Sequence, residues 1–579
     1  MKAIIPLLSC YLSTLSCALG QSEIYNNPRG KAEHDPDFWR SNSIEELTQR
    51  LQLKMNTNQA KNIIFFLGDG MGVSTVTAGR IYKGQKKRNS GEESVLAIDT
   101  FPFTSLAKTY SANTQTTDSA ASSTAYLCGV KTNNHGIGVT ANVKSSDCDG
   151  ASDRNNQVDS ILAWAQKEGK WTGIVTNDEI VGASPAGGYA HVSKRSFYNS
   201  VSKGCKTKDI ARQLVEDKPG SKLRVIMGGG RKHFLPNEIA PQDEWRTKSS
   251  SKAVRGPGDR TDGRNLVEDW LDKHSKNNRT ASYIWNKSQL YRLHEGDYPG
   301  DYFFGLFAEG KLKFSMENIF DRQDKHKNSV EDEQPTLEEM TIAAINILQK
   351  SPSGYILFVE CHNIDTAHHG NLAGYALEEL YQLDKAILAA HKMTSLDDTL
   401  TIVTADHSHA FTLNGYSARG TDILGASNSL PYSILSYAAG PGASAEEETD
   451  SRHRSLYTHK AMVYLRSGVH GGEDVAVYAK GPWAHLFTGS HENTYIPIAL
   501  AYAACINHKG PHCNTKKPSS RLVVLETSVD NRNQTLIDHI NGRTIAPDVL
   551  KPSRRVVRKV LRRSNPFEPS SPSGRDHES

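Results

Sequence analysis

Five short apolar runs recur along the chain, and each ends in glycine or in a polar residue. The runs occupy residues 62–70, 172–176, 224–230, 355–360 and 399–407. Continuous runs of this length are typical of strands that are buried on both faces of a parallel sheet. Between them, residues 157–169 and 336–350 repeat apolar positions with the period of a helix. The alternation predicts an α/β fold around a large, mostly parallel sheet.

Two segments depart from this alternation. Residues 36–60 have the pattern of an amphipathic helix within an N-terminal arm at 21–60, and we expect it to pack on a partner. Residues 413–470 are rich in glycine, serine and charge, which predicts an inserted lobe. The main domain is therefore expected to span residues 61–513. A composition of 37% hydrophobic and 23% charged residues fits an ordinary globular protein.

The first twenty residues, MKAIIPLLSCYLSTLSCALG, combine one lysine, a short apolar core and small residues at a cleavage point. This pattern predicts a secretory signal peptide at 1–20. No hydrophobic C-terminal signal for a lipid anchor is seen in the sequence, so we expect a secreted, extracellular protein. Three sequons, at Asn278, Asn286 and Asn533, are compatible with glycosylation.

Six cysteines follow the predicted signal peptide, and an oxidising compartment permits them to pair. Cys505 and Cys513 are close enough in sequence to form a local clip. Cys148 with Cys205 would close a longer loop. The other two cysteines lie in apolar segments and are expected to be buried free thiols, Cys128 and Cys361.

Basic charge is concentrated at the end of the chain. From Lys551 onward the sequence holds eight lysine or arginine residues and three acidic ones, mixed with serine and proline. This composition predicts a disordered tail at 514–579, with weak contact to an anionic surface as the alternative. Nucleic acid is not expected as a partner, because no aromatic residue is interleaved with the charges before Phe567.

The stretch FVECHNIDTAHH, residues 358–369, ends an apolar run in potential metal ligands. Asp365 and His369 are four residues apart, a spacing that places both side chains on one face of a helix. Such groups are costly to hold together unless a cation neutralises them. A solvated helix face or a core histidine is the alternative for each motif taken alone. Further candidates close other apolar runs or stand near glycines: Asp69, Glu360, Asp406, His407 and His470.

The segment TDSAASSTAYLCG, residues 117–129, has small residues suited to a helix that begins at Asp118 and Ser119. Ser119 would then lie at the helix N-terminus, where backbone N–H groups and the helix dipole favour an anion such as phosphate. The local alternative is a simple pair of capping residues.

Taken in order, six motifs resemble animal alkaline phosphatases over residues 36–513: GDGMG, the Asp-Ser element, ASPAGGYAH with a later arginine, FVE…IDTAHH, TADHSH and HGGEDV. The resemblance implies a three-layer sandwich with a crown-like lobe, and a homodimer. It also implies hydrolysis of phosphate monoesters through a phosphoserine intermediate, with two zinc ions and one magnesium ion per subunit. The alternatives are a phosphodiesterase or sulfatase of the same superfamily, and a secreted phosphate- or metal-binding protein without turnover.

The resemblance also implies roles for individual residues. Ser119 would be the nucleophile, and Arg195 would hold the phosphate. One zinc ion would be bound by Asp365, His369 and His470. The other would be bound by Asp69, Asp406, His407 and Ser119 itself. Magnesium would be bound by Asp69, Ser184 and Glu360, an all-oxygen set that suits a hard cation. Three more histidines have no metal-binding role in this scheme and would orient ligands or serve the fold: His362, His368 and His409.

The chain departs from the family pattern in places. Animal members usually carry histidines where this chain has Gly182 and Thr366, so we expect looser magnesium binding unless a water or another side chain substitutes. Cys361 stands where glycine is usual. Ala308 and Gln334 replace two carboxylates of a calcium site found in vertebrate members, so a complete calcium site is not expected.

Overall fold

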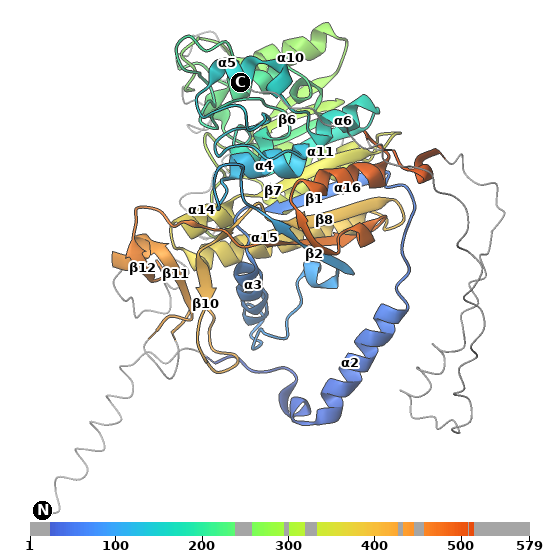
Figure 1. Ribbon diagram of the computed structural model, residues 1–579, viewed down its shortest axis with the longest axis vertical. Coiled ribbons are helices and arrows are strands. Elements are labelled where there is room, and N and C mark those ends of the chain that lie inside the picture. Colours follow the sequence, from blue (N-terminus) through green and yellow to red (C-terminus); the bar gives the residue numbers. More distant parts are fainter. Residues whose placement is uncertain are drawn as a thin grey trace, which may run out of the picture.

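The computed structural model describes residues 24–237, 258–294, 300–318, 333–426, 432–444, 457–507 and 509–514. Two of the predictions above fall outside these ranges: the signal peptide, and the basic tail with its sequon at Asn533. Within the described residues the chain forms one large sheet flanked by helices and two small sheets (Figure 1).

The large sheet has ten strands in the described chain. Their spatial order is β15 (Gly489–Glu492), β2 (Phe103–Lys108), β14 (Val475–Lys480), β8 (Thr399–Thr404), β1 (Asn62–Gly68), β7 (Tyr355–Cys361), β3 (Trp171–Glu179), β4 (Val225–Gly229), β6 (Tyr302–Leu306) and β5 (Ala281–Ile284). Every pairing is parallel except the two made by β14, which runs antiparallel to β2 and β8. The predicted α/β class with a mostly parallel sheet is confirmed.

Helices cover both faces of this sheet. The α-helices of the described chain are α2 (Pro36–Leu51), which stands apart from the sheet, and α3 (Val73–Gln85), α4 (Ser119–Cys128), α5 (Cys148–Ser152), α6 (Ile161–Lys167), α7 (Ala183–Ala186), α8 (Ile210–Glu216), α10 (Leu266–Lys276), α11 (Lys287–His294), α13 (Leu337–Leu348), α14 (Asn363–His369), α15 (Ala373–Met393) and α16 (Tyr495–Ala504). Figure 1 shows α4 and α16 on one side of the central strands, and α3 and α15 on the other. Because both faces are covered, the residues of β7 are all buried.

The predicted elements overlap the observed ones, and their ends differ. Strand β3 extends beyond the predicted 172–176 at both ends, and β7 extends one residue beyond the predicted 355–360. The helix expected at 157–169 begins only at Ile161, because Gln157 pairs with Val139 and the side chain of Ser160 caps the first turn. It ends before Gly169, which has a positive φ of 75°. The helix expected at 336–350 begins at Leu337, where Thr336 and Glu339 form a capping box.

Strands β10 (Phe411–Leu413), β11 (Leu435–Gly440) and β12 (Ala461–Tyr464) form a separate small sheet. Strands β11 and β12 lie in the region expected to be an inserted lobe, and β10 ends where that region begins. Asn371, directly after α14, ties this sheet to the main body: its amide donates to Ala439 O (3.4 Å) and its Oδ1 accepts from Gly442 N (2.9 Å). The boundaries 413–470 of the lobe stay a prediction.

Helix α2 lies in the N-terminal arm and stands apart from the main body in Figure 1. The side chain of Asp35 caps its first turn, and Pro36 occupies the first helical position. None of its residues is buried by the part of the chain that the structure describes. Trp39, Leu47 and Leu51 are exposed.

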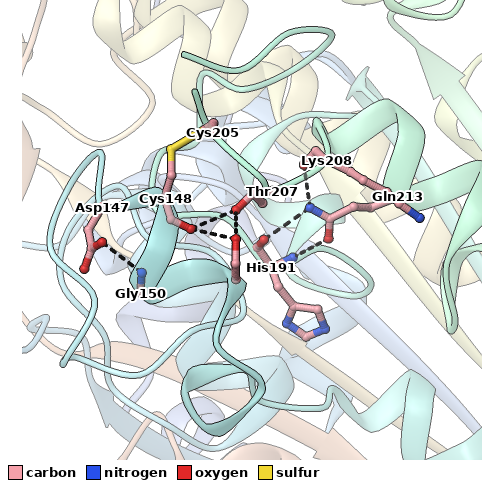
Figure 2. Close-up of a disulfide and its surroundings, with 9 residues drawn as sticks. Asp147, Cys148, Gly150, His191, Cys205, Thr207, Lys208 and Gln213 are labelled. Atoms are coloured by element: carbon pink, nitrogen blue, oxygen red, sulfur yellow. Dashed lines mark hydrogen bonds between the residues drawn. A yellow bond between two sulfur atoms is a disulfide. The ribbon is translucent and has the colours of Figure 1, made fainter. Parts of the chain in front are cut away.

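Two disulfides join the cysteines that the sequence suggested as pairs. Cys505 bonds to Cys513, and Cys148 bonds to Cys205 across 57 residues. Figure 2 shows that the carbonyl oxygen of Cys148 also accepts from Thr207 Oγ1 at 3.1 Å, so the two loops are joined by hydrogen bonds as well. Cys128 and Cys361 are buried free thiols.

Candidate metal centre

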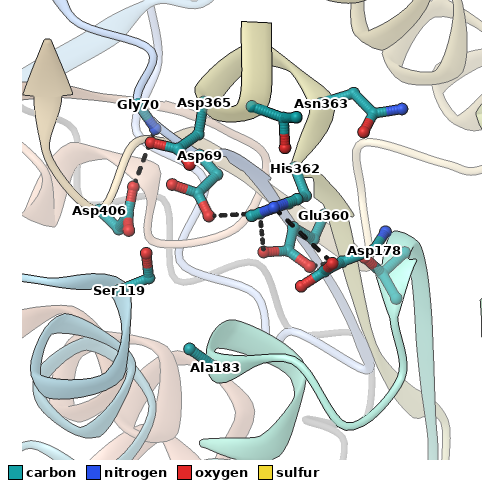
Figure 3. Close-up of polar contacts among 12 residues, drawn as sticks. Asp69, Gly70, Ser119, Asp178, Ala183, Glu360, His362, Asn363, Asp365 and Asp406 are labelled. Atoms are coloured by element: carbon teal, nitrogen blue, oxygen red, sulfur yellow. Dashed lines mark hydrogen bonds and ion pairs between the residues drawn. The ribbon is translucent and has the colours of Figure 1, made fainter. Parts of the chain in front are cut away.

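Three adjacent strands deliver the acidic side chains of the site. Strand β1 lies between β7 and β8, with Leu67 opposite Glu360 on one side and Thr404 on the other. Asp69 follows β1, and Asp406 follows β8. All three carboxylates therefore meet at one edge of the sheet, the carboxyl edge of the parallel strands (Figure 3). Each is at most 1% exposed.

The first cluster joins α14 to a short strand. Asp365 and His369 lie one turn apart on α14, with His369 Nε2 3.4 Å from Asp365 Oδ2. Strand β13 (His470–Gly471) pairs with β9 (Ser408–His409) and brings His470 Nε2 to 3.5 Å from Asp365 Oδ1 and 3.2 Å from His369 Nε2. The Nδ1 atoms of both rings face backbone carbonyls, of Gly468 at 2.7 Å and Thr117 at 2.9 Å.

These carbonyl contacts decide which ring nitrogen carries the proton. A carbonyl only accepts, so Nδ1–H donates to it in His369 and in His470, and each Nε2 presents a lone pair. Two lone pairs 3.2 Å apart beside a buried carboxylate repel one another unless a cation lies between them. The donor set of two nitrogens and one carboxylate matches the ligands that zinc favours.

The second cluster surrounds the hydroxyl of Ser119. His407 Nε2 lies 3.1 Å from Asp406 Oδ2, 3.4 Å from Asp69 Oδ1 and 3.3 Å from Ser119 Oγ. Its Nδ1 contacts Ser408 O at 3.1 Å, so this ring too aims a lone pair at the carboxylates. Ser119 is the first residue of α4, which Asp118 caps by accepting from Ala121 N at 3.1 Å.

The third cluster consists of oxygen atoms. Asp69 Oδ1, Glu360 Oε1 and Ser184 Oγ are buried and have no hydrogen-bond partner among the described residues. Ser184 lies in α7, and the other carboxylate oxygen of Glu360 accepts from Thr176 Oγ1 at 2.5 Å. Buried polar atoms are nearly always satisfied, so three such orphans in one place fit a bound hard cation.

The carboxylates strongly disfavour ionising together in the absence of a cation. Burial, helped by neighbouring carboxylates, raises the pKa of Asp69 well above its usual range and that of Glu360 to about 8. Burial raises the pKa of Asp406 to about 6. Burial acts in the same direction on Asp365, but His409 and its neighbours outweigh it and hold the pKa of Asp365 well below its usual range. Divalent cations would supply the missing positive charge.

Arg195 lies beside the nucleophile candidate. Its Nη1 donates to Asp118 Oδ2 at 3.3 Å, and its backbone N–H donates to the carbonyl of His135 at 2.8 Å. Asp118 therefore caps α4 and orients Arg195 at once. Sequence reasoning named Asp118 only as a cap and missed His135, whose Nδ1 is 3.3 Å from Asp118 Oδ2. No local pattern marks His135, because it belongs to a loop.

The three remaining histidines lie next to the site. His409 Nε2 contacts Asp365 Oδ1 at 2.5 Å, and His362 Nδ1 contacts Asp69 Oδ2 at 2.8 Å. His368 instead bridges Thr75 Oγ1 (3.0 Å) and the hydroxyl of Tyr437 (2.8 Å), which links α3 to the small sheet.

Gly182, Thr366 and Gln334, three positions at which this chain departs from the family pattern, have defined surroundings in the structure. A Cβ at Gly182 would lie 1.9 Å from Asp178 Oδ2, so the Asp178 carboxylate fills the space that a side chain at 182 would need. Thr366 Oγ1 lies 3.2 Å from Lys311 Nζ. Gln334 Oε1 accepts from the backbone of Lys313 at 2.8 Å. Sequence reasoning missed Asp178 and Lys311.

An α/β sandwich of this kind, with carboxylates and imidazoles clustered around one serine at the start of a helix, is typical of a metal-dependent hydrolase. A family model described as alkaline phosphatase matches residues 60–506. The tissue-nonspecific alkaline phosphatase of Gallus gallus is 42% identical over 519 residues, covering 85% of this chain and 94% of that protein. The membrane-bound alkaline phosphatase of Bombyx mori is 40% identical over 502 residues, covering 83% of this chain and 87% of that protein. The chain belongs to the alkaline phosphatase family and is a phosphoric monoester hydrolase.

Solved structures agree at the level of the fold. The crystal structure of Thermus thermophilus alkaline phosphatase superimposes with a TM-score of 0.56 at 20% identity, covering 79% of this chain and 94% of that one. The family implies divalent metal cofactors, and the described chain holds carboxylate and imidazole clusters that suit them. Among the described helices, none combines the length and apolar character needed to cross a membrane.

Proposed function

We propose that Ser119 takes the phosphoryl group from a phosphate monoester and later yields it to water. The observation that carries this proposal is the placement of Ser119 Oγ, buried at the start of α4 and 3.3 Å from His407 Nε2. The free N–H groups of the first helical turn favour an anion at this position. Two divalent cations, when bound, would lower the pKa of the hydroxyl and neutralise charge that develops on the phosphoryl and leaving oxygens.

The three clusters support an assignment of the metal ligands. We assign one zinc ion to Asp365, His369 and His470, and the other to Asp69, Asp406, His407 and Ser119. Magnesium is assigned to Asp69, Ser184 and Glu360, whose unsatisfied oxygens support a hard cation.

Arg195 binds the phosphate in this scheme. A planar guanidinium donates two parallel hydrogen bonds to nonbridging oxygens, which lysine does not reproduce. Asp118 positions the guanidinium, since it accepts from Arg195 Nη1 at 3.3 Å. None of these residues is assigned to the alcohol portion of the substrate, so we expect a broad range of monoesters.

The phosphoserine is tested by trapping it. Protein quenched in acid during turnover of a radiolabelled monoester should carry label in the wild type and in Ser123→Ala, and none in Ser119→Ala. Ser123 is a matched control, because it lies on the same helix but its hydroxyl donates to Ala120 O and Ala183 O. Label or turnover retained in Ser119→Ala would refute the assignment.

Metal content tests the cofactors independently of turnover. Elemental analysis of the folded protein should give two zinc ions and one magnesium ion per chain, and removal of zinc should abolish monoester cleavage. Parallel assays with a phosphodiester and a sulfate ester separate the superfamily alternatives, since only the monoester should be cleaved efficiently. A zinc-loaded protein that cleaves none of the three would instead be a binding protein.

We also propose that the protein is a secreted homodimer. Support comes from exposed apolar side chains on the small sheet and its loop, where Tyr416 is 98% and Met462 is 88% exposed, and on α2 in the arm. Two disulfides fit an oxidising compartment. Light scattering should give twice the chain mass, and Met462→Asp with Tyr464→Asp should give the monomer. Recovery of the protein in the medium of expressing cells tests secretion.

A further inference from the structure

Three hydrogen-bonded side chains connect the solvent to the third cluster, which consists of the oxygen atoms of Asp69, Glu360 and Ser184. Lys311 Nζ lies 2.6 Å from His362 Nε2, and His362 Nδ1 lies 2.8 Å from Asp69 Oδ2. The three residues come from separate places: Lys311 follows β6, His362 stands between β7 and α14, and Asp69 follows β1. Figure 3 shows His362 pointing between Asp69, Glu360 and Asp178.

The first contact fixes the tautomer of His362. An ammonium group has three donors and no acceptor, so His362 Nε2 must accept from Lys311. The ring proton then sits on Nδ1 and is donated to Asp69 Oδ2. His369 and His470 have the same tautomer, because carbonyls hold their ring protons on Nδ1. Their rings are turned the other way, so that the Nε2 lone pair faces the site, whereas His362 directs its Nδ1–H at Asp69.

The alternative tautomer would change the chemistry of the third cluster. The ligand atoms of Asp69, Glu360 and His362 all lie within 4.8 Å of one another, which is close enough to share a cation. With its proton on Nε2, His362 would present Nδ1 as a nitrogen ligand, and a mixed nitrogen and oxygen set favours zinc over magnesium. With Nδ1 protonated, the set remains all oxygen.

Asp178 keeps the lysine in place. Its Oδ1 lies 3.8 Å from Lys311 Nζ and 3.7 Å from His362 Nε2, and it is buried without a hydrogen-bond partner among the described residues. It fills the space beside Gly182 that a larger residue would need. The hydroxyl of Thr366 is a further partner of Lys311, at 3.2 Å.

We propose that Lys311, acting through His362, keeps the cation site of Asp69, Ser184 and Glu360 free of nitrogen ligands and so selects magnesium over zinc. The two are positioning residues, because neither touches the reacting atoms. The proposal rests on the metal assignment under the proposed function. It also supplies the substitute for the side chains absent at Gly182 and Thr366, so magnesium binding need not be loose.

The test removes the donor and measures metals. Stripped protein is reloaded with zinc and magnesium in competition, its metal content is measured, and cobalt absorption spectra report nitrogen ligation. Wild type should hold two zinc ions and one magnesium ion. Lys311→Met frees the alternative tautomer and should hold a third zinc ion, with the ratio of magnesium to zinc affinity at this site lowered about tenfold or more.

Matched variants distinguish an effect of Lys311 through His362 from a general distortion of the site. His362→Asn retains an N–H donor near the position of Nδ1 and should keep magnesium. Adding it to Lys311→Met should restore two zinc ions and one magnesium ion, because the nitrogen ligand is gone. Lys311→Arg, which also only donates, should match the wild type. Should Lys311→Met fail to fold, Lys311→Gln gives the test, since its amide oxygen accepts from Nε2–H.

Two results would overturn the proposal that Lys311 acts through His362. One is an unchanged ratio of magnesium to zinc in folded Lys311→Met or Lys311→Gln. The other is a third zinc ion that persists in the double variant. A wild-type protein that holds no zinc during turnover would instead overturn the metal assignment, so the two failures are distinguishable.

Discussion

The buried carboxylate of Glu360 makes the stability of the metal-free protein fall as pH rises. Burial and the neighbouring Asp178 carboxylate raise its pKa from 4.5 to about 8 in the folded chain. Between these values the folded protein holds a proton that the unfolded chain has released. Unfolding then releases a proton, so the free energy of unfolding decreases with rising pH in this window. Replacing Glu360 with glutamine removes this loss of stability with rising pH, because glutamine does not ionise.

The size of the effect follows from the shift. Each pKa unit corresponds to about 1.4 kcal/mol, and most of the shifted window lies between pH 5 and pH 8. We therefore expect the stability difference between Glu360→Gln and wild type, both stripped of metal, to grow by about 3 kcal/mol over this range. Burial lowers the pKa of histidines such as His407, and this makes the stability of the protein rise with pH, which is the opposite trend. Both proteins contain these histidines, so their contribution cancels in the difference between the two stabilities.

The assay is urea unfolding of both proteins at pH 5 and pH 8, with and without metals. In the metal-loaded state Glu360→Gln should be the less stable protein, because it lacks the carboxylate that we propose as a magnesium ligand. Glu379 is a matched control: burial raises its pKa to about 7, yet it contacts Ser315 N at 2.6 Å and lies outside the metal clusters. Glu379→Gln should show the same trend whether or not metals are bound. A metal-free difference that is flat or shrinks with pH would refute the reasoning.

Three further changes have defined outcomes. Arg195→Lys should raise the KM for monoesters roughly tenfold, about 1.4 kcal/mol, because lysine does not make two parallel hydrogen bonds to the phosphate. Competitive inhibition by inorganic phosphate should weaken by the same factor, and unchanged inhibition would contradict this. Serine at both Cys148 and Cys205, which are 57 residues apart, should lower the unfolding free energy by about 4 kcal/mol in denaturant titration. Gly440→Ala should cost about 2 kcal/mol in thermal unfolding, since φ is 144° and a Cβ would meet Asn371 Oδ1 at 2.1 Å; an unchanged melting temperature would argue against that strain.

The strands that the sequence predicted are those at the centre of the sheet. Strands β1 and β7 read as continuous apolar runs because helices cover both of their faces. Strands β2 and β14 were missed, since their residues alternate between buried and more exposed positions and lie toward one side of the sheet. The antiparallel direction of β14 depends on a long connection whose path has no local sequence signal.

The ligand candidates were predictable for a similar reason. Asp69, Glu360 and Asp406 each end a buried run, so the parallel topology alone places them together. The groups that orient them were not predictable. Lys311 lies in a loop far from the ligand candidates in sequence. Asp178 lies near the end of β3, only six residues before Ser184, but the sequence does not show that it approaches Lys311 and His362. What they do becomes visible only as distances to His362.

The position of His369 shows that the small sheet is part of the metal centre's support. The Nδ1–H of His369 donates to Gly468 O, and the backbone N–H of Gly468 donates back to His369 O, both at 2.7 Å. Residue 468 belongs to the segment that follows β12, whose exposed apolar side chains we propose to meet a second subunit. A displacement of that segment would rotate the imidazole and move Nε2 away from Asp365. The lobe and the cation cluster are therefore linked through two hydrogen bonds. The association of two chains that we propose would thereby have a physical route to the occupancy of the proposed zinc site of Asp365, His369 and His470.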